Sequence, residues 1–182
     1  MTPVRINNVL NELDYTQLAN FILPDETNFP WYFYADSAYK NGGEQIFQFV
    51  HNVYRDDKPT TLEWLYALTQ KVIAKLPDII GDKKIELYRA KFNLLPRQIY
   101  KPDDLILSKH VDRDEDEYIS MVYYLEDSDG DTVIFDKHQE EKYRFTPKAN
   151  TCIIFKSNTW HRATPPTNNK VRRVLNIVVK VL

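Results

Sequence analysis

The segment of residues 118–125, YISMVYYL, is a short run dominated by β-branched, aromatic and other apolar side chains, which is typical of a buried strand. Comparable β-favouring runs occupy residues 85–92, 132–135, 151–155 and 174–181. Turn-forming residues separate them, as in DSDGD at 127–131, where a hairpin turn is the favoured interpretation, and TPKAN at 146–150. We therefore predict that the second half of the chain consists of closely spaced β-strands.

The first half of the chain has a different periodicity. Residues 15–23 and 60–76 carry apolar side chains at steps of three and four, which predicts two amphipathic helices. Only four glycines are present and no Gly/Ser-rich linker occurs, so residues 1–182 are expected to form one domain. We predict an α+β fold in which a mainly helical part, 1–80, buttresses a double-stranded β-helix, or jelly-roll, core at 85–182.

The composition of the chain argues against several classes of function. The chain has 182 residues, 43% of them apolar, and 24 Lys and Arg against 26 Asp and Glu give a net charge of −2. Because basic residues do not outnumber acidic ones, the net charge does not suggest a nucleic-acid or anionic-membrane partner. There is neither a signal-type apolar stretch nor an apolar run of about 18 residues, and the single cysteine, Cys152, excludes an internal disulfide. A cytoplasmic protein without a membrane partner is expected.

Histidine is scarce, with only His51, His110, His138 and His161 in the chain. In His110-Val111-Asp112 the first and third side chains point to the same side of an extended segment, so both can reach one ion. His161 follows the predicted strand 151–155 and a polar turn, near a strand end. Two histidines and one carboxylate form a facial triad, which is typical of non-haem iron(II) sites. His51 and His138 have no partner at ligand spacing and are expected to be structural.

Arg172 begins the last β-like run, where an inward-facing guanidinium can hold a carboxylate through two hydrogen bonds. Arg173 would project to the opposite face, so the choice between the two depends on strand register. The aromatic run at residues 29–34 is interpreted mainly as core packing between helix and sheet.

The order His110-x-Asp112, His161, Arg172, together with the segment 119–125, resembles the Fe(II)/2-oxoglutarate-dependent dioxygenases, especially their prolyl-4-hydroxylase-like branch. The resemblance covers residues 85–182. It implies that His110, Asp112 and His161 bind iron(II). It further implies that the far carboxylate of 2-oxoglutarate is bound by Arg172, Tyr124 and Tyr100. Many members have serine two residues after the arginine, whereas Val174 stands here; alignment of 175–176 with the family strand favours Arg172.

Residues 28–32 and 48–54 resemble hydroxylase-like proteins of marine phages and bacteria, which for a phage-encoded protein implies the host cytoplasm. The family resemblance implies an oxygenase that uses O2 and hydroxylates a protein or peptide side chain, or a small amino-acid-like substrate, with release of succinate and CO2. No catalytic residue beyond the metal and cosubstrate ligands is expected. Nucleic-acid demethylases of the superfamily carry a second arginine where Val178 stands here, which disfavours that branch.

Two alternatives stay open. One is a catalytically silent jelly-roll binding module, and the other is a cupin-like metal hydrolase or isomerase that holds a different ion with the same side chains.

Overall fold

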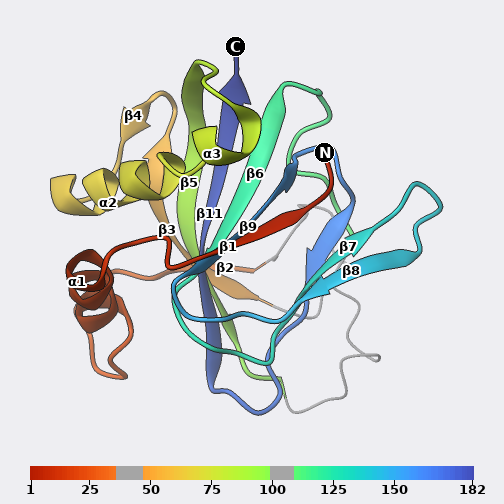
Figure 1. Ribbon diagram of the computed structural model, residues 1–182. Helices are drawn as coiled ribbons and strands as arrows, with labels where there is room; N and C mark the ends of the chain where they lie inside the picture. Colours follow the sequence, from red (N-terminus) through yellow and green to blue (C-terminus); the bar gives the residue numbers. More distant parts are fainter. Residues whose placement is uncertain (36–46, 99–108) are drawn as a thin grey trace.

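The computed structural model describes residues 1–35, 47–98 and 109–182. Two antiparallel β-sheets form the centre of the molecule, and helices flank the larger one (Figure 1). The helices are α1 (Glu12–Ile22), α2 (Glu63–Ile73) and the short α3 (Pro77–Ile80). The strands are β1 (Val4–Asn7), β2 (Tyr32–Tyr34), β3 (Gln48–Arg55), β4 (Lys58–Pro59), β5 (Ile85–Pro96), β6 (Tyr118–Tyr124), β7 (Thr132–Phe135), β8 (Glu141–Phe145), β9 (Thr151–Lys156), β10 (His161–Ala163) and β11 (Val171–Val181).

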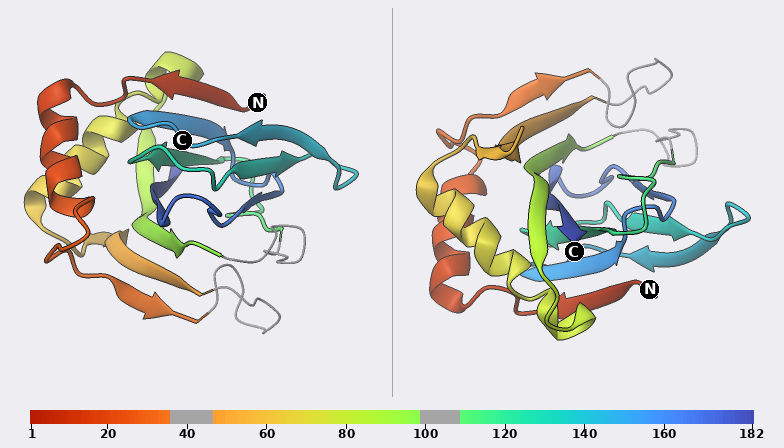
Figure 2. Two further views of the ribbon diagram at one scale, coloured as in Figure 1. Left: turned by 90° about the horizontal axis from the view of Figure 1, so that it is seen from below. Right: turned by 90° about the horizontal axis from the view of Figure 1, so that it is seen from above.

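The large sheet has the strand order β1-β9-β6-β11-β5-β3-β2, with β4 paired to β3, and the small sheet has the order β10-β7-β8. Figure 2 shows the helices on one side of the large sheet and the small sheet on the other. Two facing antiparallel sheets with helices outside them are the architecture of a buttressed jelly roll. The predicted fold class is therefore confirmed.

The central strand β6 is buried along its whole length because both of its faces are covered. Met121 and Tyr123 belong to the core beneath the helices, together with Leu18 and Val72. Val122 and Tyr124 belong instead to the core between the two sheets. Successive side chains of a strand point to opposite faces, so the two neighbouring tyrosines enter different cores.

The first 80 residues contribute more strand than expected. The predicted helices correspond to α1 and α2, but β1 pairs with β9, and β3 pairs with β5. The expectation of a mainly helical N-terminal part was therefore incomplete. The reason is that β3 buries two polar residues, Gln48 and His51, and leaves Phe49 and Tyr54 partly exposed. Its sequence therefore has no clear apolar period of two.

Part of the aromatic run also differs from expectation. Phe29 is buried and stacks edge-on with Phe92, as core packing predicts. Tyr32, Phe33 and Tyr34 are exposed, since they form β2 at the edge of the large sheet. None of the helices in the described part of the chain is long and apolar enough to cross a membrane.

Residues 127–131 do not form the predicted hairpin turn. They carry the chain from β6 in the large sheet to β7 in the small sheet, so the strands on either side are not paired. Asp129 holds this crossover in place, because its carboxylate accepts hydrogen bonds from the backbone N–H groups of Thr167, Asn168 and Asn169 at 2.9, 2.8 and 3.1 Å. These bonds join the crossover to the segment that leads into β11.

Replacing Asp129 by Asn is expected to make folding less stable in a pH-dependent way. Burial alone would raise the pKa of Asp129, but the hydrogen bonds from Thr167, Asn169 and Asn168 outweigh it and hold the pKa below its ordinary value. A folded-state pKa below the unfolded one stabilises the fold above about pH 4, and that contribution is lost as pH falls through the folded value. We expect a loss of about 2 kcal/mol at pH 7, measured by urea unfolding, which shrinks below about pH 4.

The control for this prediction is Asp82→Asn, which removes an exposed carboxylate from the loop before β5. This control should unfold like the unmodified protein at both pH 7 and pH 3. An Asp129→Asn loss of the same size at pH 7 and pH 3 would contradict the assigned role of the carboxylate.

Candidate active site

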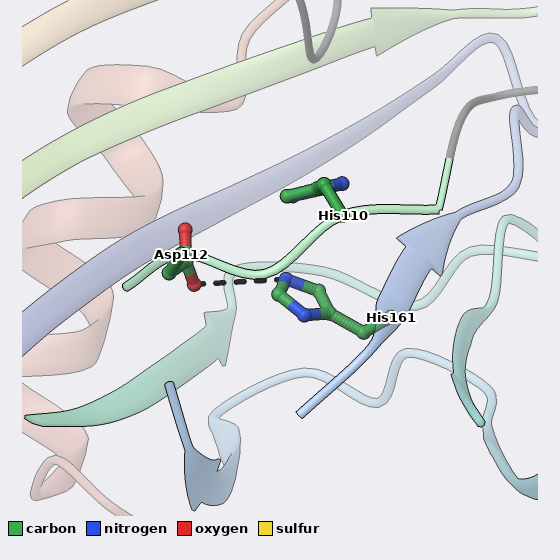
Figure 3. A group of neighbouring side chains, drawn as sticks. All are labelled: His110, Asp112 and His161. Carbon is green, nitrogen blue, oxygen red and sulfur yellow. Dashed lines mark ion pairs between the residues drawn. The ribbon is translucent and has the colours of Figure 1, made fainter. Parts of the chain in front are cut away.

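His110, Asp112 and His161 come together where the two sheets meet (Figure 3). His110 and His161 form an isolated antiparallel bridge, in which each backbone N–H donates to the other residue's carbonyl at 2.9 Å. The backbone N–H of Asp112 donates to the carbonyl of Ser157 at 2.9 Å. The backbone thus holds the segment 110–112 against β10 and the turn before it. The side chains reach one point because of this pairing.

The geometry of the three side chains suits a single ion. Ligand atoms of all three residues lie within 4.8 Å of one another. His161 Nε2 lies 3.6 Å from Asp112 Oδ2, the contact drawn as a dashed line in Figure 3. His161 Nδ1 lies 2.9 Å from the carbonyl oxygen of Thr159, which can only accept, so the proton belongs on Nδ1. The lone pair on Nε2 is then free to bind an ion at the candidate metal position.

Asp112 is held by a dense set of hydrogen bonds, and its side chain is only 5% exposed. Arg89 Nη2 donates to Oδ1 at 2.7 Å, and the Ser120 hydroxyl donates to Oδ2 at 2.6 Å. Burial by itself would raise the pKa of Asp112, but its neighbours His161, Arg89 and His110 and the hydrogen bond from Ser120 hold the pKa well below its ordinary range. The carboxylate is therefore anionic and oriented at neutral pH.

The remaining histidines have other roles. His51 Nδ1 lies 2.9 Å from the Pro30 carbonyl and Nε2 lies 2.7 Å from the Thr61 hydroxyl, so both ring nitrogens are used in structural bonds. Burial lowers the pKa of His51, with the bond to Pro30 opposing it. His138 is exposed in the turn between β7 and β8.

A cavity of about 90 Å³ adjoins the three candidate ligands. Its lining consists of Gln48, Lys91, Asn93, Leu95, His110, Asp112, Val122, Thr132, His161, Ala163, Arg172, Val174 and Asn176. Arg172 is 3% exposed and donates from Nε to the Gly130 carbonyl at 2.7 Å and from Nη2 to the Thr132 hydroxyl at 2.8 Å. Arg173 lies outside this lining and pairs with Glu126 at 3.0 Å. Strand register thus places Arg172, and not Arg173, at the cavity.

A family model for the 2OG-Fe(II) oxygenase superfamily matches residues 98–180. This match covers fewer than half of the 182 residues. Enzymes of this superfamily use ferrous iron and 2-oxoglutarate, which is the chemistry implied by two histidines, a carboxylate and an arginine at one cavity. No curated protein matches the chain.

Solved structures share the fold of this oxygenase at low sequence identity. An oxidoreductase of the 2OG-Fe(II) oxygenase family from Burkholderia pseudomallei has a TM-score of 0.74 and 13% identity, over 98% of this chain and 84% of that chain. A Trichoplax adhaerens prolyl hydroxylase, solved with a hypoxia inducible factor peptide fragment, has a TM-score of 0.63 and 14% identity, over 99% and 83%. HygX from Streptomyces hygroscopicus, solved with nickel, 2-oxoglutarate and hygromycin B, has a TM-score of 0.62 and 10% identity, over 98% and 82%.

The residues predicted to bind the cosubstrate differ in whether they line the cavity. Tyr124 is fully buried and donates from its hydroxyl to Thr132 Oγ1 at 2.8 Å, so in this structure it lies behind Thr132 and outside the lining. Burial raises the pKa of Tyr124 to about 12, with Arg172 and the bond to Thr132 opposing the rise, so the phenol remains a donor. Val174 lines the cavity where serine is common in the family. Tyr100 lies outside the described residues.

Thr132 is a cavity residue that sequence reasoning missed. Its hydroxyl oxygen accepts from both Tyr124 and Arg172, so its own proton is left for another acceptor. The sequence showed only a β-branched residue opening the run TVIF, which is an ordinary strand start. A threonine directly after the DSDGD crossover was the available signal, but its contact with Arg172 joins residues 40 positions apart.

Position 130 has no room for a side chain because the Arg172 side chain passes next to it. A Cβ at Gly130 would lie 2.7 Å from the Thr164 carbonyl oxygen and 2.8 Å from Arg172 Cδ, closer than real contacts allow. Gly130→Ala is expected to reduce stability by about 1 to 3 kcal/mol, as overpacking does, and to weaken 2-oxoglutarate binding because Arg172 must shift. Urea unfolding and a titration with 2-oxoglutarate measure the two effects.

Gly81→Ala is the matched control, because Gly81 has a φ of 78° but open space around its Cβ position. It should destabilise the fold through backbone strain and leave 2-oxoglutarate affinity unchanged. Equal 2-oxoglutarate affinities in the two variants would rule out the proposed link between Gly130 and Arg172.

Proposed function

We propose that this chain is an oxygenase in which His110, Asp112 and His161 hold ferrous iron and Arg172 holds the far carboxylate of 2-oxoglutarate. The product of the cosubstrate would be succinate, with release of CO2, and a protein or peptide side chain or a small amino-acid-like molecule would be hydroxylated with O2. Residues 1–182 would act as one domain, an idea supported by the pairing of β1 with β9 and of β3 with β5.

One observation carries the cosubstrate assignment. Among the described residues, Arg172 is a buried cation with neutral hydrogen-bonding partners, the Gly130 carbonyl and the Thr132 and Tyr124 hydroxyls, and no carboxylate lies within ion-pair distance. Burial lowers the pKa of Arg172, with Tyr124 and Asp131 opposing it, yet a guanidinium stays charged. A buried cation is costly unless an anion compensates it. A dicarboxylate that reaches from the metal position to Arg172 supplies that anion.

The other groups have complementary roles in this proposal. His161 presents Nε2 because Thr159 holds its Nδ1 proton, and Asp112 stays anionic because Arg89 and Ser120 hold it. Thr132 donates to the same carboxylate as Arg172. Bound iron supplies the oxygen activation that couples decarboxylation of 2-oxoglutarate to hydroxylation.

The partner class is argued from what the neighbours bind. One neighbour was solved with a peptide and another with hygromycin B, so this fold accommodates both kinds of substrate. A net charge of −2 gives no support to a nucleic-acid substrate. A cytoplasmic location is part of the proposal and is supported by the buried, unpaired thiol of Cys152.

The first experiment is an anaerobic titration of the apo-protein with iron(II) and then 2-oxoglutarate, followed through the weak visible charge-transfer band of the chelate. We expect the band to appear, and succinate to form when oxygen is admitted. If metal binds but no band develops, a metal hydrolase or isomerase, or a silent binding module, explains the same three side chains better.

A further inference from the structure

Lys91 and Asn93 form a polar wall of the cavity that the cosubstrate assignment does not use. Both lie on β5, two residues apart, and so face the same side of the sheet. In the pairing of β5 with β11, Lys91 is opposite Asn176, Asn93 is opposite Val174, and Leu95 is opposite Arg172. Lys91 is thus about 13 Å along the strand direction from the level of Arg172.

Lys91 lies at the level of the candidate metal ligands. Arg89 Nη2 donates both to Asp112 Oδ1 at 2.7 Å and to Asn176 Oδ1 at 3.2 Å, so Asn176 is next to the metal ligand Asp112. Lys91 is the register partner of Asn176. The two ends of the cavity therefore differ: Arg172 is at one end, and Lys91 is beside the metal position.

Both residues have polar groups without partners. Lys91 Nζ makes no hydrogen bond or ion pair with any residue that the structure describes. Burial lowers its pKa to about 8, with Arg89 adding to the shift and Asp112 opposing it. Asn93 Nδ2 donates to Gln48 Oε1 at 2.9 Å, but Asn93 Oδ1 is buried and has no partner among the described residues. A cation and a buried acceptor oxygen thus both lack a partner in the described part of the chain, at a cost that a ligand would offset once the Asn93 side chain rotates toward it.

Lys91 also borders a second hollow, of about 500 Å³, that leads along β2 and β3 past Tyr34, Asn52 and Arg55. Lys91 thus lines both the cavity beside the candidate metal ligands and this second hollow. The other cations there have counter-ions, since Arg89 pairs with Asp112 and Arg55 with Asp56.

We propose that Lys91 and Asn93 bind the prime substrate, and that this substrate is a free α-amino acid. Lys91 Nζ donates to the carboxylate, and Asn93 Oδ1 accepts from the ammonium group. Alternate strand residues are about 7 Å apart, a span that the two groups on one α-carbon bridge with one hydrogen bond at each end. A residue inside a peptide chain has neither a free α-carboxylate nor an ammonium group. This inference rests on the oxygenase function proposed above.

The test uses the full chain loaded with iron(II) and 2-oxoglutarate. The twenty free amino acids and their N-acetyl amide derivatives are compared as stimulants of succinate formation. At least one free amino acid is expected to stimulate it about tenfold or more over its capped derivative, the scale of one lost charge-assisted bond. Equal stimulation by a capped derivative, or no stimulation by any free amino acid while the charge-transfer band forms, would overturn the proposal. Failure of the band itself would instead defeat the proposed function.

Variants of Lys91 then test whether this residue is responsible for the stimulation by a free amino acid. Lys91→Met is expected to reduce kcat/KM for the stimulating amino acid about 10- to 100-fold, while the 2-oxoglutarate titration of the band is unchanged. Lys83→Met, which alters an exposed lysine before β5, should change neither quantity. Lys91→Gln repeats the test if the methionine variant does not fold. A weakened 2-oxoglutarate titration in the Lys91 variant would assign this lysine to the cosubstrate and overturn the proposal.

Discussion

Asp112→Ala is expected to abolish iron-dependent succinate formation, with a loss beyond the roughly 10- to 100-fold that follows removal of a group merely supporting a metal ligand. The substitution removes the only anionic ligand of the candidate triad and the charged acceptor that Arg89 and Ser120 share. Iron(II) affinity by equilibrium dialysis and succinate release with oxygen measure the effect. Asp114→Ala, which removes an exposed carboxylate two residues away, should behave like the unmodified protein.

His161→Ala extends this prediction to the other sheet. Since His161 is the candidate ligand that the backbone bridge brings to the segment 110–112, its loss should reduce iron binding and turnover as severely as the loss of Asp112. His138→Ala, at an exposed turn, is the matched control. Unchanged iron binding and turnover in His161→Ala would show that the assigned triad is wrong.

Arg172→Ala is expected to raise the concentration of 2-oxoglutarate required for half-saturation by about 100-fold or more. Removing one partner of a buried, hydrogen-bonded charge pair costs about 2 to 5 kcal/mol, because the other charge stays buried and unpaired. Turnover at saturating 2-oxoglutarate should fall much less, since the candidate metal ligands are intact. The charge-transfer band measures cosubstrate affinity directly, and succinate release gives the requirement under turnover.

Arg173→Ala is a control of the same charge on the adjacent residue. Arg173 pairs with Glu126 away from the cavity, so its loss should lower stability without changing 2-oxoglutarate affinity. If both variants weakened cosubstrate binding equally, the effect would be one of general charge or stability, and Arg172 would lose its assigned role.

Several features of the fold were predictable because they depend on short stretches of sequence. The β-favouring runs correspond to β5, β6, β7, β9 and β11, and the helical periodicity corresponds to α1 and α2. The less apolar β8 was missed since its pattern is exposed or half-buried. The three-residue β10 was missed because its only strand signal is its pairing with β7.

The amino-acid sequence by itself determined which residue types are present for chemistry: a His-x-Asp pair, a distal histidine and an arginine at the start of the last strand. Only the tertiary structure decided how they meet. It aligned His110 with His161 and directed Arg172 rather than Arg173 to the cavity. It also placed Thr132 between Tyr124 and Arg172 and brought Lys91 level with the candidate metal ligands. Local periodicity depends on neighbours in sequence, whereas strand register and the facing of two sheets depend on contacts between residues tens of positions apart, which no local pattern encodes.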